Sequence, residues 1–247
     1  MLKIMTLNLN YLVDKHGAWP ERRGLIARTI EQNGPDIIAF QAVRAMGGGL
    51  TQIEELSRLV SGYPYRVFIA AVEHGDGTAD GSAFLSRVPS SSVDSLRLSL
   101  PDDPDDPTPR VLLHGVFVLQ QGILDLLNCH FSWISPQAVR SVSEVLPYVG
   151  GINGPVMLVG DMNSTPETEA MKKLAQAGFI DVWSELHPGD TGFTFEADNP
   201  SIRIDYAWIN PLLQPLLKGI EQVGELSPHP PRLSDHLGLV VTLELAA

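Results

Sequence analysis

Short apolar runs bounded by Gly, Pro, Asn or Asp recur from one end of the chain to the other. Many of these runs are rich in β-branched residues, which is typical of strands. They cover Leu2–Leu9, Ile37–Phe40, Tyr65–Ala71, Ala83–Leu85, Val111–Leu119, Ile123–Cys129, Val156–Val159, Ile204–Ile209 and Leu237–Leu243. Only Gln120-Gln121-Gly122 separates Val111–Leu119 from Ile123–Cys129, and this spacing predicts an antiparallel hairpin.

Apolar residues at helical spacing predict two helices in the first quarter of the chain, over Glu21–Gln32 and Thr51–Val60. Thr51 and Glu54 are spaced as in a capping box, in which each side chain satisfies a backbone N–H at the start of a helix. The second helix is therefore expected to begin at Thr51.

Two further helices are predicted where a hydroxyl residue precedes a proline. Ser135 before Pro136 and Thr165 before Pro166 combine a capping side chain with a proline suited to the first helical turn. The helices are expected over about residues 136–148 and 166–176, and Gly178 is a suitable stop for the second.

Many strands with a few helices between them indicate two packed sheets flanked by helices. The chain has no composition shift, linker or internal repeat that would mark a domain boundary. We therefore expect a single domain over residues 1–247.

The chain has 247 residues, of which 44% are hydrophobic and 19% charged, as in a soluble globular protein. Its single cysteine, Cys129, excludes an internal disulfide and a Cys-based zinc site, and its apolar surroundings predict a buried, inert thiol. The N-terminal residues turn polar too soon for a signal peptide, and no apolar stretch reaches the ~20 residues of a membrane helix. These features predict a cytoplasmic protein without a transmembrane segment, and no obligate protein partner is evident.

The formal net charge is −12, from 17 basic and 29 acidic residues. Non-specific nucleic-acid binding relies on Lys and Arg, so this balance lowers the expectation of a nuclease without excluding one. The densest charge run, Pro101–Pro107, is acidic and is interpreted as a solvated loop, which would repel long polyanions if it bordered the active site. The arginines that the fold could bring together are Arg22, Arg23, Arg28, Arg44 and Arg110.

Polar side chains stand at the ends of several of these runs. Asp161 and Asn163 follow an apolar run, whereas Asp205 and Asp235-His236 adjoin one. A carboxylate at such a place is costly to desolvate unless it is paired, and the usual partner is a metal ion or a histidine. An oxygen-rich set of this kind suits Mg²⁺ or Mn²⁺, which polarise phosphoryl oxygens.

Five strings in order carry a resemblance that covers nearly the whole chain: Thr6-x-Asn8, Asp36–Gln41, Gly160-Asp161-x-Asn163-x-x-Pro166, Arg203-Ile204-Asp205-Tyr206 and Ser234-Asp235-His236. In these strings the chain resembles the endonuclease/exonuclease/phosphatase superfamily of metal-dependent phosphoesterases. The resemblance implies an α/β (α+β) fold, a four-layered sandwich of two mainly antiparallel sheets flanked by helices.

The resemblance also implies roles for individual residues. Asp161 and Asn163 would orient the attacking water and contact the scissile phosphate, although a turn rich in Asp and Asn is the alternative for this pair alone. Asp205 would hold His236 and raise its basicity, so that the imidazole acts on water or the phosphate. Asp235 would be a metal ligand, and a surface Asp-His pair is the alternative for Asp235 and His236.

Three more residues take roles from the resemblance. His130 matches a phosphate contact and candidate acid for the leaving oxygen in the deoxyribonuclease and sphingomyelinase branches, and a strand-end histidine is the alternative. Asn8 resembles the Asn that supports the metal site, and its alternative is a turn residue. Arg110 resembles a substrate-binding Arg, with a surface Arg as the alternative. Four tryptophans, Trp19, Trp133, Trp183 and Trp208, are interpreted as packing residues.

Ala42 departs from the resemblance, because the family has Gln-Glu where this chain has Gln41-Ala42. In the family that Glu is a direct metal ligand. Three explanations are open: an engineered Glu-to-Ala variant, a natural pseudoenzyme, or another acid such as Glu73 reaching the site. A decayed site usually loses more than one member, which favours the first.

The resulting hypothesis is a Mg²⁺- or Mn²⁺-dependent phosphoesterase that acts on a phosphodiester, either nucleic acid or a lipid or small-molecule phosphodiester. Ala42 would leave it weakened or inactive, because metal assistance supplies several kcal/mol of transition-state stabilisation. The alternative hypothesis is a non-catalytic pseudoenzyme of the same fold that binds a phosphoryl ligand.

Overall fold

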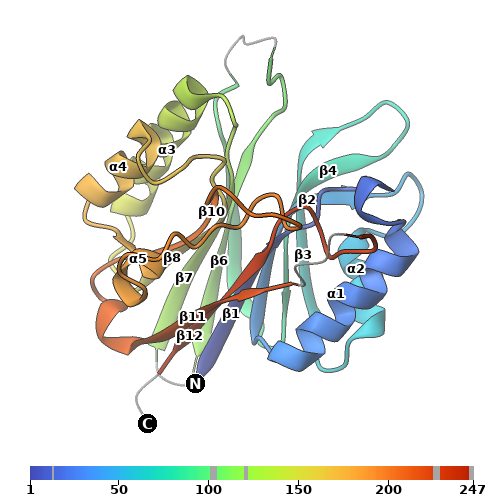
Figure 1. Ribbon diagram of the computed structural model, residues 1–247, viewed down its shortest axis with the longest axis horizontal. Coiled ribbons are helices and arrows are strands. Elements are labelled where there is room, and N and C mark those ends of the chain that lie inside the picture. Colours follow the sequence, from blue (N-terminus) through green and yellow to red (C-terminus); the bar gives the residue numbers. More distant parts are fainter. Residues whose placement is uncertain (13, 101–104, 120–121, 225–228, 245–247) are drawn as a thin grey trace.

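The computed structural model describes residues 1–12, 14–100, 105–119, 122–224 and 229–244 (Figure 1). The strands within these ranges are β1 (Leu2–Asn8), β2 (Ile37–Ala45), β3 (Tyr65–Glu73), β4 (Ala79–Ser86), β5 (Ser90–Arg97), β6 (Val111–Leu119), β7 (Gly122–His130), β8 (Val156–Asp161), β9 (Ile180–Asp181), β10 (Asp205–Ile209), β11 (Leu217–Val223) and β12 (Gly238–Leu243). The helices are α1 (Trp19–Asn33), α2 (Gln52–Leu59), α3 (Ser135–Gly150), α4 (Glu169–Gln176) and α5 (Val182–Leu186), with short 3₁₀ turns at Asp14–His16 and Gln214–Leu216.

The strands form two six-stranded sheets, in the orders β11-β12-β1-β2-β4-β3 and β5-β6-β7-β8-β10-β9. One neighbouring pair in each sheet is parallel, β1 with β2 and β7 with β8, and the other pairs are antiparallel. Helices α1 and α2 flank the first sheet, and α3 and α4 flank the second (Figure 1). The predicted α/β sandwich of two mainly antiparallel sheets flanked by helices is confirmed.

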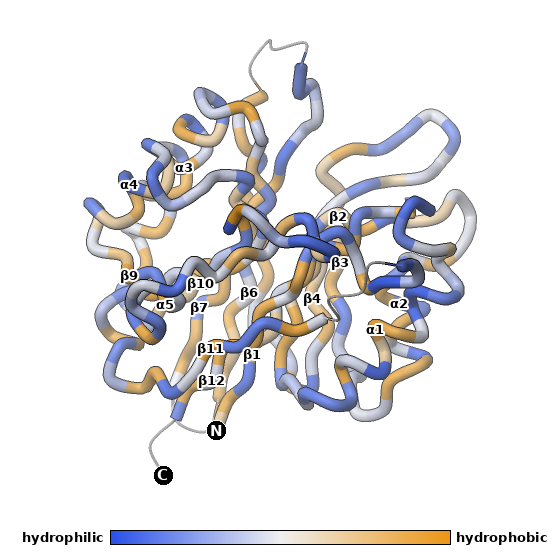
Figure 2. Tube along the Cα trace, in the orientation of Figure 1, coloured by the Kyte–Doolittle hydropathy of each residue, from blue (hydrophilic) through white to orange (hydrophobic). Residues whose placement is uncertain are grey.

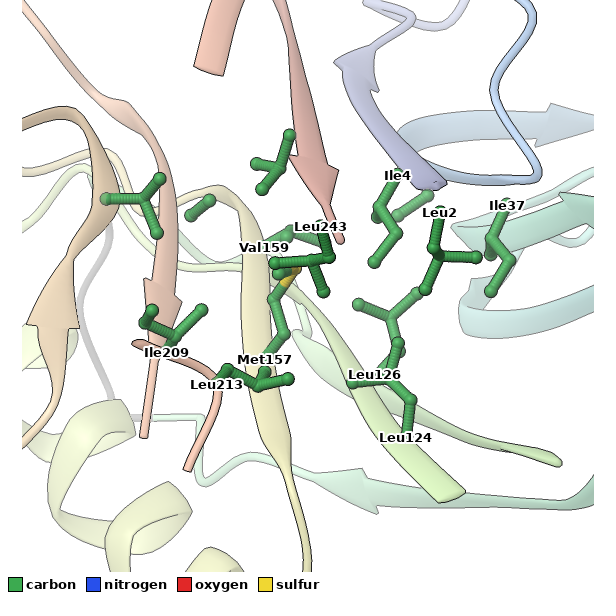
Figure 3. Close-up of a cluster of buried hydrophobic side chains, with 14 of the residues drawn as sticks. Leu2, Ile4, Ile37, Leu124, Leu126, Met157, Val159, Ile209, Leu213 and Leu243 are labelled. Atoms are coloured by element: carbon green, nitrogen blue, oxygen red, sulfur yellow. The ribbon is translucent and has the colours of Figure 1, made fainter. Parts of the chain in front are cut away.

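Three apolar clusters fill the spaces between these layers. The central cluster contains Ile4 of the first sheet and Leu126 of the second, so it lies between the two sheets (Figure 3). A second cluster joins the first sheet to Ile30 of α1. A third joins the second sheet to Val142 of α3 and Leu174 of α4. Hydrophobic positions accordingly concentrate on the central strands, and hydrophilic positions are frequent along the outer loops (Figure 2).

Most predicted elements form where the sequence places them. Each predicted strand is present, and β6 and β7 pair as the expected hairpin, although residues 120 and 121 of its turn lie outside the described part of the chain. The capping box is confirmed, because the Thr51 side chain accepts from the Glu54 N–H and the Glu54 side chain accepts from the Thr51 N–H. Cys129 is fully buried, and burial raises the pKa of its thiol, as expected of an inert residue.

One predicted cap and one predicted helix start are wrong. Ser135 is the first residue of α3 rather than its cap, because Ile134 holds the cap position without a side-chain bond. Helix α4 begins at Glu169 and not near Pro166, because the Thr168 N–H bonds to the Thr165 carbonyl in a separate turn. No helix in the described ranges is long and apolar enough to cross a membrane.

Besides the two-residue strand β9, two strands lack a clear signal in the sequence. The β5 segment is rich in serine, and its side chains are mostly exposed at the edge of the second sheet. The β11 segment is an edge strand of the first sheet and includes the polar residues Lys218, Glu221 and Gln222. Both strands form because their backbones hydrogen-bond to a neighbouring strand, and the hydropathy pattern of a sequence does not reveal such pairing.

A polar bridge crosses the core between the two sheets. Asn128 of β7 is fully buried, and its Nδ2 donates to the carbonyls of Phe40 at 2.9 Å and Ala83 at 3.1 Å. Its Oδ1 accepts from Nε2 of Gln41 at 2.7 Å. The pairing of β2 with β4 shifts register between Phe40 and Val43, and Asn128 satisfies polar groups beside this bulge.

We predict that Asn128→Leu lowers the free energy of unfolding by about 3 kcal/mol, because it removes the side-chain donor to two buried carbonyls and one acceptor of the Gln41 amide. Urea denaturation measures this change. The matched control is Asn153→Leu at an exposed position, for which we expect a change within about 0.5 kcal/mol. Equal stability of the two variants would show that the cross-sheet bridge contributes nothing.

Candidate active site

A cleft of about 640 Å³ opens where β1, β7 and β8 end at one edge of the sandwich. It is lined by Asn8, Asn10, Tyr11, Ala42, Asp106, Thr108, Arg110, His130, Trp133, Ser135, Asp161, Asn163, Ser164, Thr165, Thr168, Phe195, Ile202, Ile204, Asp235 and His236. Every predicted site residue except Asp205 lines this cleft, and Asp205 hydrogen-bonds to His236. The structure therefore brings the predicted set together.

Strand register explains much of this convergence. His130 ends β7 directly beside Asp161 at the end of β8, and Asp161 pairs across the sheet with Asp205 at the start of β10. Neighbouring strands lie about 4.8 Å apart. Three residues distant in sequence thus form a row across one edge of the second sheet.

The Asp161 carboxylate is buried and lies at the centre of the site. Its Oδ2 accepts from Nδ2 of Asn8 at 2.8 Å and of Asn163 at 3.3 Å, and its Oδ1 accepts from the Asn163 N–H at 2.8 Å. Nε2 of His130 lies 3.6 Å from Oδ2, and Nε2 of His236 lies 3.7 Å from it. Burial raises the pKa of Asp161 to about 6, although the His236 charge opposes the shift.

The backbone around Asp161 is shaped by its neighbours in the motif. Gly160 has a φ of 134°, and a Cβ at this position would lie 2.0 Å from the Cys129 carbonyl oxygen. Only glycine fits that close approach between β7 and β8. Asn163 has a φ of 48°, and its Nδ2 also donates to the Phe131 carbonyl at 2.9 Å. The Gly-Asp-x-Asn string is therefore a structural unit that fixes the carboxylate.

His236 forms a buried acid–imidazole pair. Its Nδ1 lies 2.9 Å from Oδ2 of Asp205. Burial lowers the pKa of the imidazole, but the charges of Asp205 and Asp161 outweigh burial and raise the pKa to about 10. His236 is therefore an imidazolium at neutral pH. The Phe195 ring packs against it, with ring centroids 4.9 Å apart.

His130 is held in the opposite protonation state. Burial, together with the positive charges of Arg110 and His236, places its pKa well below the ordinary value. The imidazole is neutral at pH 7, and it lies beside the ionisable Asp161. The site thus combines one neutral and one cationic histidine.

The oxygen donors of the cleft fit a hard divalent cation. Asp161 and Asp235 each place a carboxylate oxygen within 4 Å of Nε2 of His236. Asn8 adds a carboxamide whose Oδ1 already accepts from the Asn10 N–H at 2.8 Å. Ligand atoms of Asp161, Asp205 and His236 also lie within 4.8 Å of one another. An imidazolium has no lone pair for a metal, so oxygen atoms of the cleft, rather than His236, are the candidate donors.

Ala42 lies in the bulge of β2, at the position where the resemblance implies a Glu. Its φ of 50° is left-handed, and its carbonyl accepts from the Tyr11 N–H at 2.8 Å. The Gln41 carbonyl accepts from the Leu9 N–H at 2.9 Å. The explanation that Glu73 replaces the missing acid is wrong, because Glu73 is exposed at the end of β3 and does not line the cleft.

The interpretation of the acidic run as a solvated loop is wrong for Asp106, while residues 101–104 of the run lie outside the described part of the chain. Asp106 is 2% exposed, lines the cleft, and accepts from Arg110 at 2.8 Å and from the Ser132 hydroxyl at 2.5 Å. Burial raises the pKa of Asp106, but these hydrogen bonds prevail and lower it. The Asp106 carboxylate therefore offsets the charge of Arg110, the only Lys or Arg among the described residues that line the cleft.

Trp133 was predicted to pack inside the protein, and this is wrong. The other three tryptophans, Trp19, Trp183 and Trp208, are buried. Trp133 is 58% exposed and lines the cleft. Tyr11 and Phe195 also line it, and apart from their aromatic type neither has a feature in the sequence that predicts this position.

Comparisons with known proteins bear on the family and the fold of the chain. The model of the endonuclease/exonuclease/phosphatase family matches residues 5–236 of the chain. No curated protein sequence gives a significant match.

Several solved structures share the fold. A family protein from Leptotrichia buccalis is 18% identical with a TM-score of 0.79, and the match covers 99% of this chain and 100% of that chain. The mannosyl-6-phosphatase from Bacteroides thetaiotaomicron is 19% identical with a TM-score of 0.74, covering 98% and 99%. The human Nocturnin catalytic domain with bound sulfate is 22% identical with a TM-score of 0.70, covering 99% and 93%.

Arg22 of α1 ties together the two loops that supply Asn8 and Asp235. The residue is fully buried, and its guanidinium donates to the carbonyls of Leu9, Tyr11 and Leu233. Leu9 directly follows Asn8, and Leu233 lies two residues before Asp235. Burial lowers the pKa of Arg22, so the charge is costly to bury and the carbonyls offset that cost.

We predict that Arg22→Met lowers the free energy of unfolding by about 2 kcal/mol or more, because it removes donors from several buried carbonyls. Arg28→Met, at an exposed position of the same helix, is the control and should change stability by less than about 0.5 kcal/mol. Thermal and urea unfolding measure both variants. An Arg22→Met variant as stable as the control would contradict the proposed tie between the loops.

Proposed function

The chain belongs to the endonuclease/exonuclease/phosphatase family, and we propose that it is a divalent-metal-dependent phosphoesterase that hydrolyses a phosphodiester by metal-assisted attack of water. The observation that carries the proposal is the Asp161 carboxylate, which lies in the cleft with an amide, a neutral imidazole and an imidazolium around it. Hydrolysis of a phosphoester needs groups of these kinds, to orient water and to stabilise the charge on the phosphoryl oxygens.

In this proposal Asp161 accepts a hydrogen bond from the attacking water. A carboxyl group with a pKa of about 6 is ionised at neutral pH and is a stronger base than an ordinary aspartate. Asn163, which is fixed by its bonds to Asp161 and Phe131, orients the water and contacts the phosphoryl group.

His236 and His130 take different parts. The His236 imidazolium, held by Asp205, contributes positive charge to the phosphoryl oxygens. His130 is neutral at pH 7, so we assign it to hydrogen bonding with the phosphoryl group rather than to protonation of the leaving oxygen. Arg110, oriented by Asp106, is the proposed second contact to the substrate.

Asn8 and Asp235 are the proposed ligands of Mg²⁺ or Mn²⁺. The cation, when bound, polarises a phosphoryl oxygen and neutralises charge that develops on it. Asp235 remains partly exposed to the cleft, with 17% of its side chain accessible, and Ser234 donates to its Oδ1 at 3.0 Å. Its orientation is therefore set without the metal.

Ala42 is the reason to expect weak activity in this chain. A methyl group supplies no ligand where the family has a carboxylate. We therefore propose that the affinity for the cation is lower and that the cation is held less accurately in the cleft. The same observation favours a second candidate function, a protein that binds a phosphoryl ligand in this cleft without hydrolysing it.

We predict that Ala42→Glu raises Mg²⁺-dependent turnover by ~100-fold or more, because a restored carboxylate supplies several kcal/mol of transition-state stabilisation. The assay measures hydrolysis of bis-p-nitrophenyl phosphate, a nucleic acid and a phospholipid. Ala42→Gln is the control, since Gln matches Glu in size and in backbone strain but carries no charge. Failure of Ala42→Glu on all three substrates would favour the binding function instead.

The charge of the cleft favours a small substrate over a long polyanion. Of the five arginines that the sequence suggested, Arg110 alone lines the cleft. Arg22 is buried against carbonyls, whereas Arg23 pairs with Glu55 and Arg44 with Asp80. We propose that contacts to nucleic-acid phosphates are confined to the scissile position.

We predict a shallow salt dependence for binding of labelled duplex DNA to this chain, with about one or two phosphate contacts. Each contact lowers log K by roughly 0.9 per log unit of salt. Fluorescence anisotropy between low and moderate salt measures the slope. Tight binding with a steep slope would overturn this prediction and favour a nuclease.

A further inference from the structure

Three apolar side chains give the cleft a hydrophobic rim beside its polar centre. Trp133 is 58% exposed and Ile202 is 37% exposed, and both line the cleft together with Phe195. A large exposed apolar group is common on a protein surface, but several gathered at one cleft mark a binding surface. No role in the proposed hydrolysis uses these three side chains.

The position of Trp133 is fixed by its neighbours. The Ser132 hydroxyl donates to Oδ2 of Asp106 at 2.5 Å and accepts from the Ile134 N–H at 3.0 Å. The backbone on both sides of Trp133 is therefore anchored to the cleft wall, and the ring is presented from a rigid segment.

The segment that carries the other two side chains is also ordered. Phe195 and Ile202 pair through backbone hydrogen bonds, with the Phe195 N–H donating to the Ile202 carbonyl at 3.1 Å. The Phe195 ring contacts His236, the proposed phosphoryl contact. The apolar rim thus begins next to the place where the phosphoryl group is expected.

The charges nearby favour an uncharged group on this rim. Arg110 is the single Lys or Arg in the described lining, and its charge is offset by Asp106. A second phosphate on the substrate would find no unpaired Lys or Arg there. It would instead approach the Asp106 carboxylate, which lies next to Trp133 through Ser132.

We propose that Trp133, with Phe195 and Ile202, forms a subsite for a flat, uncharged organic group of a small ester that carries a single phosphoryl group. This inference rests on the proposed function and names its substrate class. A flat ring stacked on an exposed aromatic side chain gains free energy without any requirement for a particular sequence or charge.

The test compares non-hydrolysable phosphonates by isothermal titration calorimetry with Mg²⁺ present. Phenylphosphonate is expected to bind ~10-fold more tightly than methylphosphonate, as an aromatic stacking contact would give. Trp133→Ala should abolish this preference without weakening methylphosphonate binding, and Trp133→Phe should retain most of it. Phe193→Ala, at an exposed aromatic residue outside the cleft lining, is the control and should leave the preference unchanged. Thermal unfolding checks that each variant is folded.

A fourth ligand, 1,4-phenylenediphosphonate, tests the requirement for a single phosphoryl group and should bind no more tightly than phenylphosphonate. Tighter binding of this ligand would overturn that part of the inference. Equal binding of phenylphosphonate and methylphosphonate would overturn the subsite while leaving the proposed function intact. If neither binds, the proposed function fails and the inference fails with it.

Discussion

A buried carboxylate must be compensated by hydrogen-bond donors or positive charge, and Asp161 places this requirement on every segment that meets at the cleft. Its partner Asn8 is 153 residues away in sequence, at the end of a strand in the other sheet. His236 comes from the loop before the last strand. Asn163 supplies donors locally, but the full set of partners of Asp161 is present only when the two sheets are docked and the last loop is in place, so the fold and the site depend on each other.

The bulge at Gln41 and Ala42 in the first sheet also depends on contacts with other segments of the chain. It breaks the pairing between β2 and β4, and the neighbouring segments take up the groups that it frees. Asn128 reaches across the core to the Phe40 carbonyl, and the segment after β1 binds the carbonyls of both bulge residues. Because that segment directly follows Asn8, the bulge helps to position the proposed metal ligand as well as the main chain around it.

The sequence predicts the position of those site residues that lie at the ends of apolar strands. Asp161 and His236 adjoin strongly apolar runs, which predicts a place at strand ends, and the family resemblance implies that such ends gather at one edge of the sandwich. Asp106 could not be anticipated, because its linear context is an acidic run and its partners Ser132 and Arg110 meet it only in the folded chain. Trp133 was misjudged for a related reason. Residue type gives the tendency to be buried, but the orientation of an anchored loop decides whether one ring faces the core or the cleft.

The backbone at Ala42 supplies a final argument about the missing carboxylate. A left-handed φ costs a residue with a Cβ roughly 1 kcal/mol, a strain that glycine would relieve. Backbone strain of this kind is retained where the surrounding structure fixes it, commonly at functional sites. Here the hydrogen bond from the Tyr11 N–H holds the left-handed backbone of Ala42, and the side chain at this position faces the cleft. A methyl group requires neither the strained backbone nor the orientation toward the cleft. Position 42 is therefore still shaped to present a longer side chain to the site. Around this position, Asp161 and Asp205 both keep their contacts with His236.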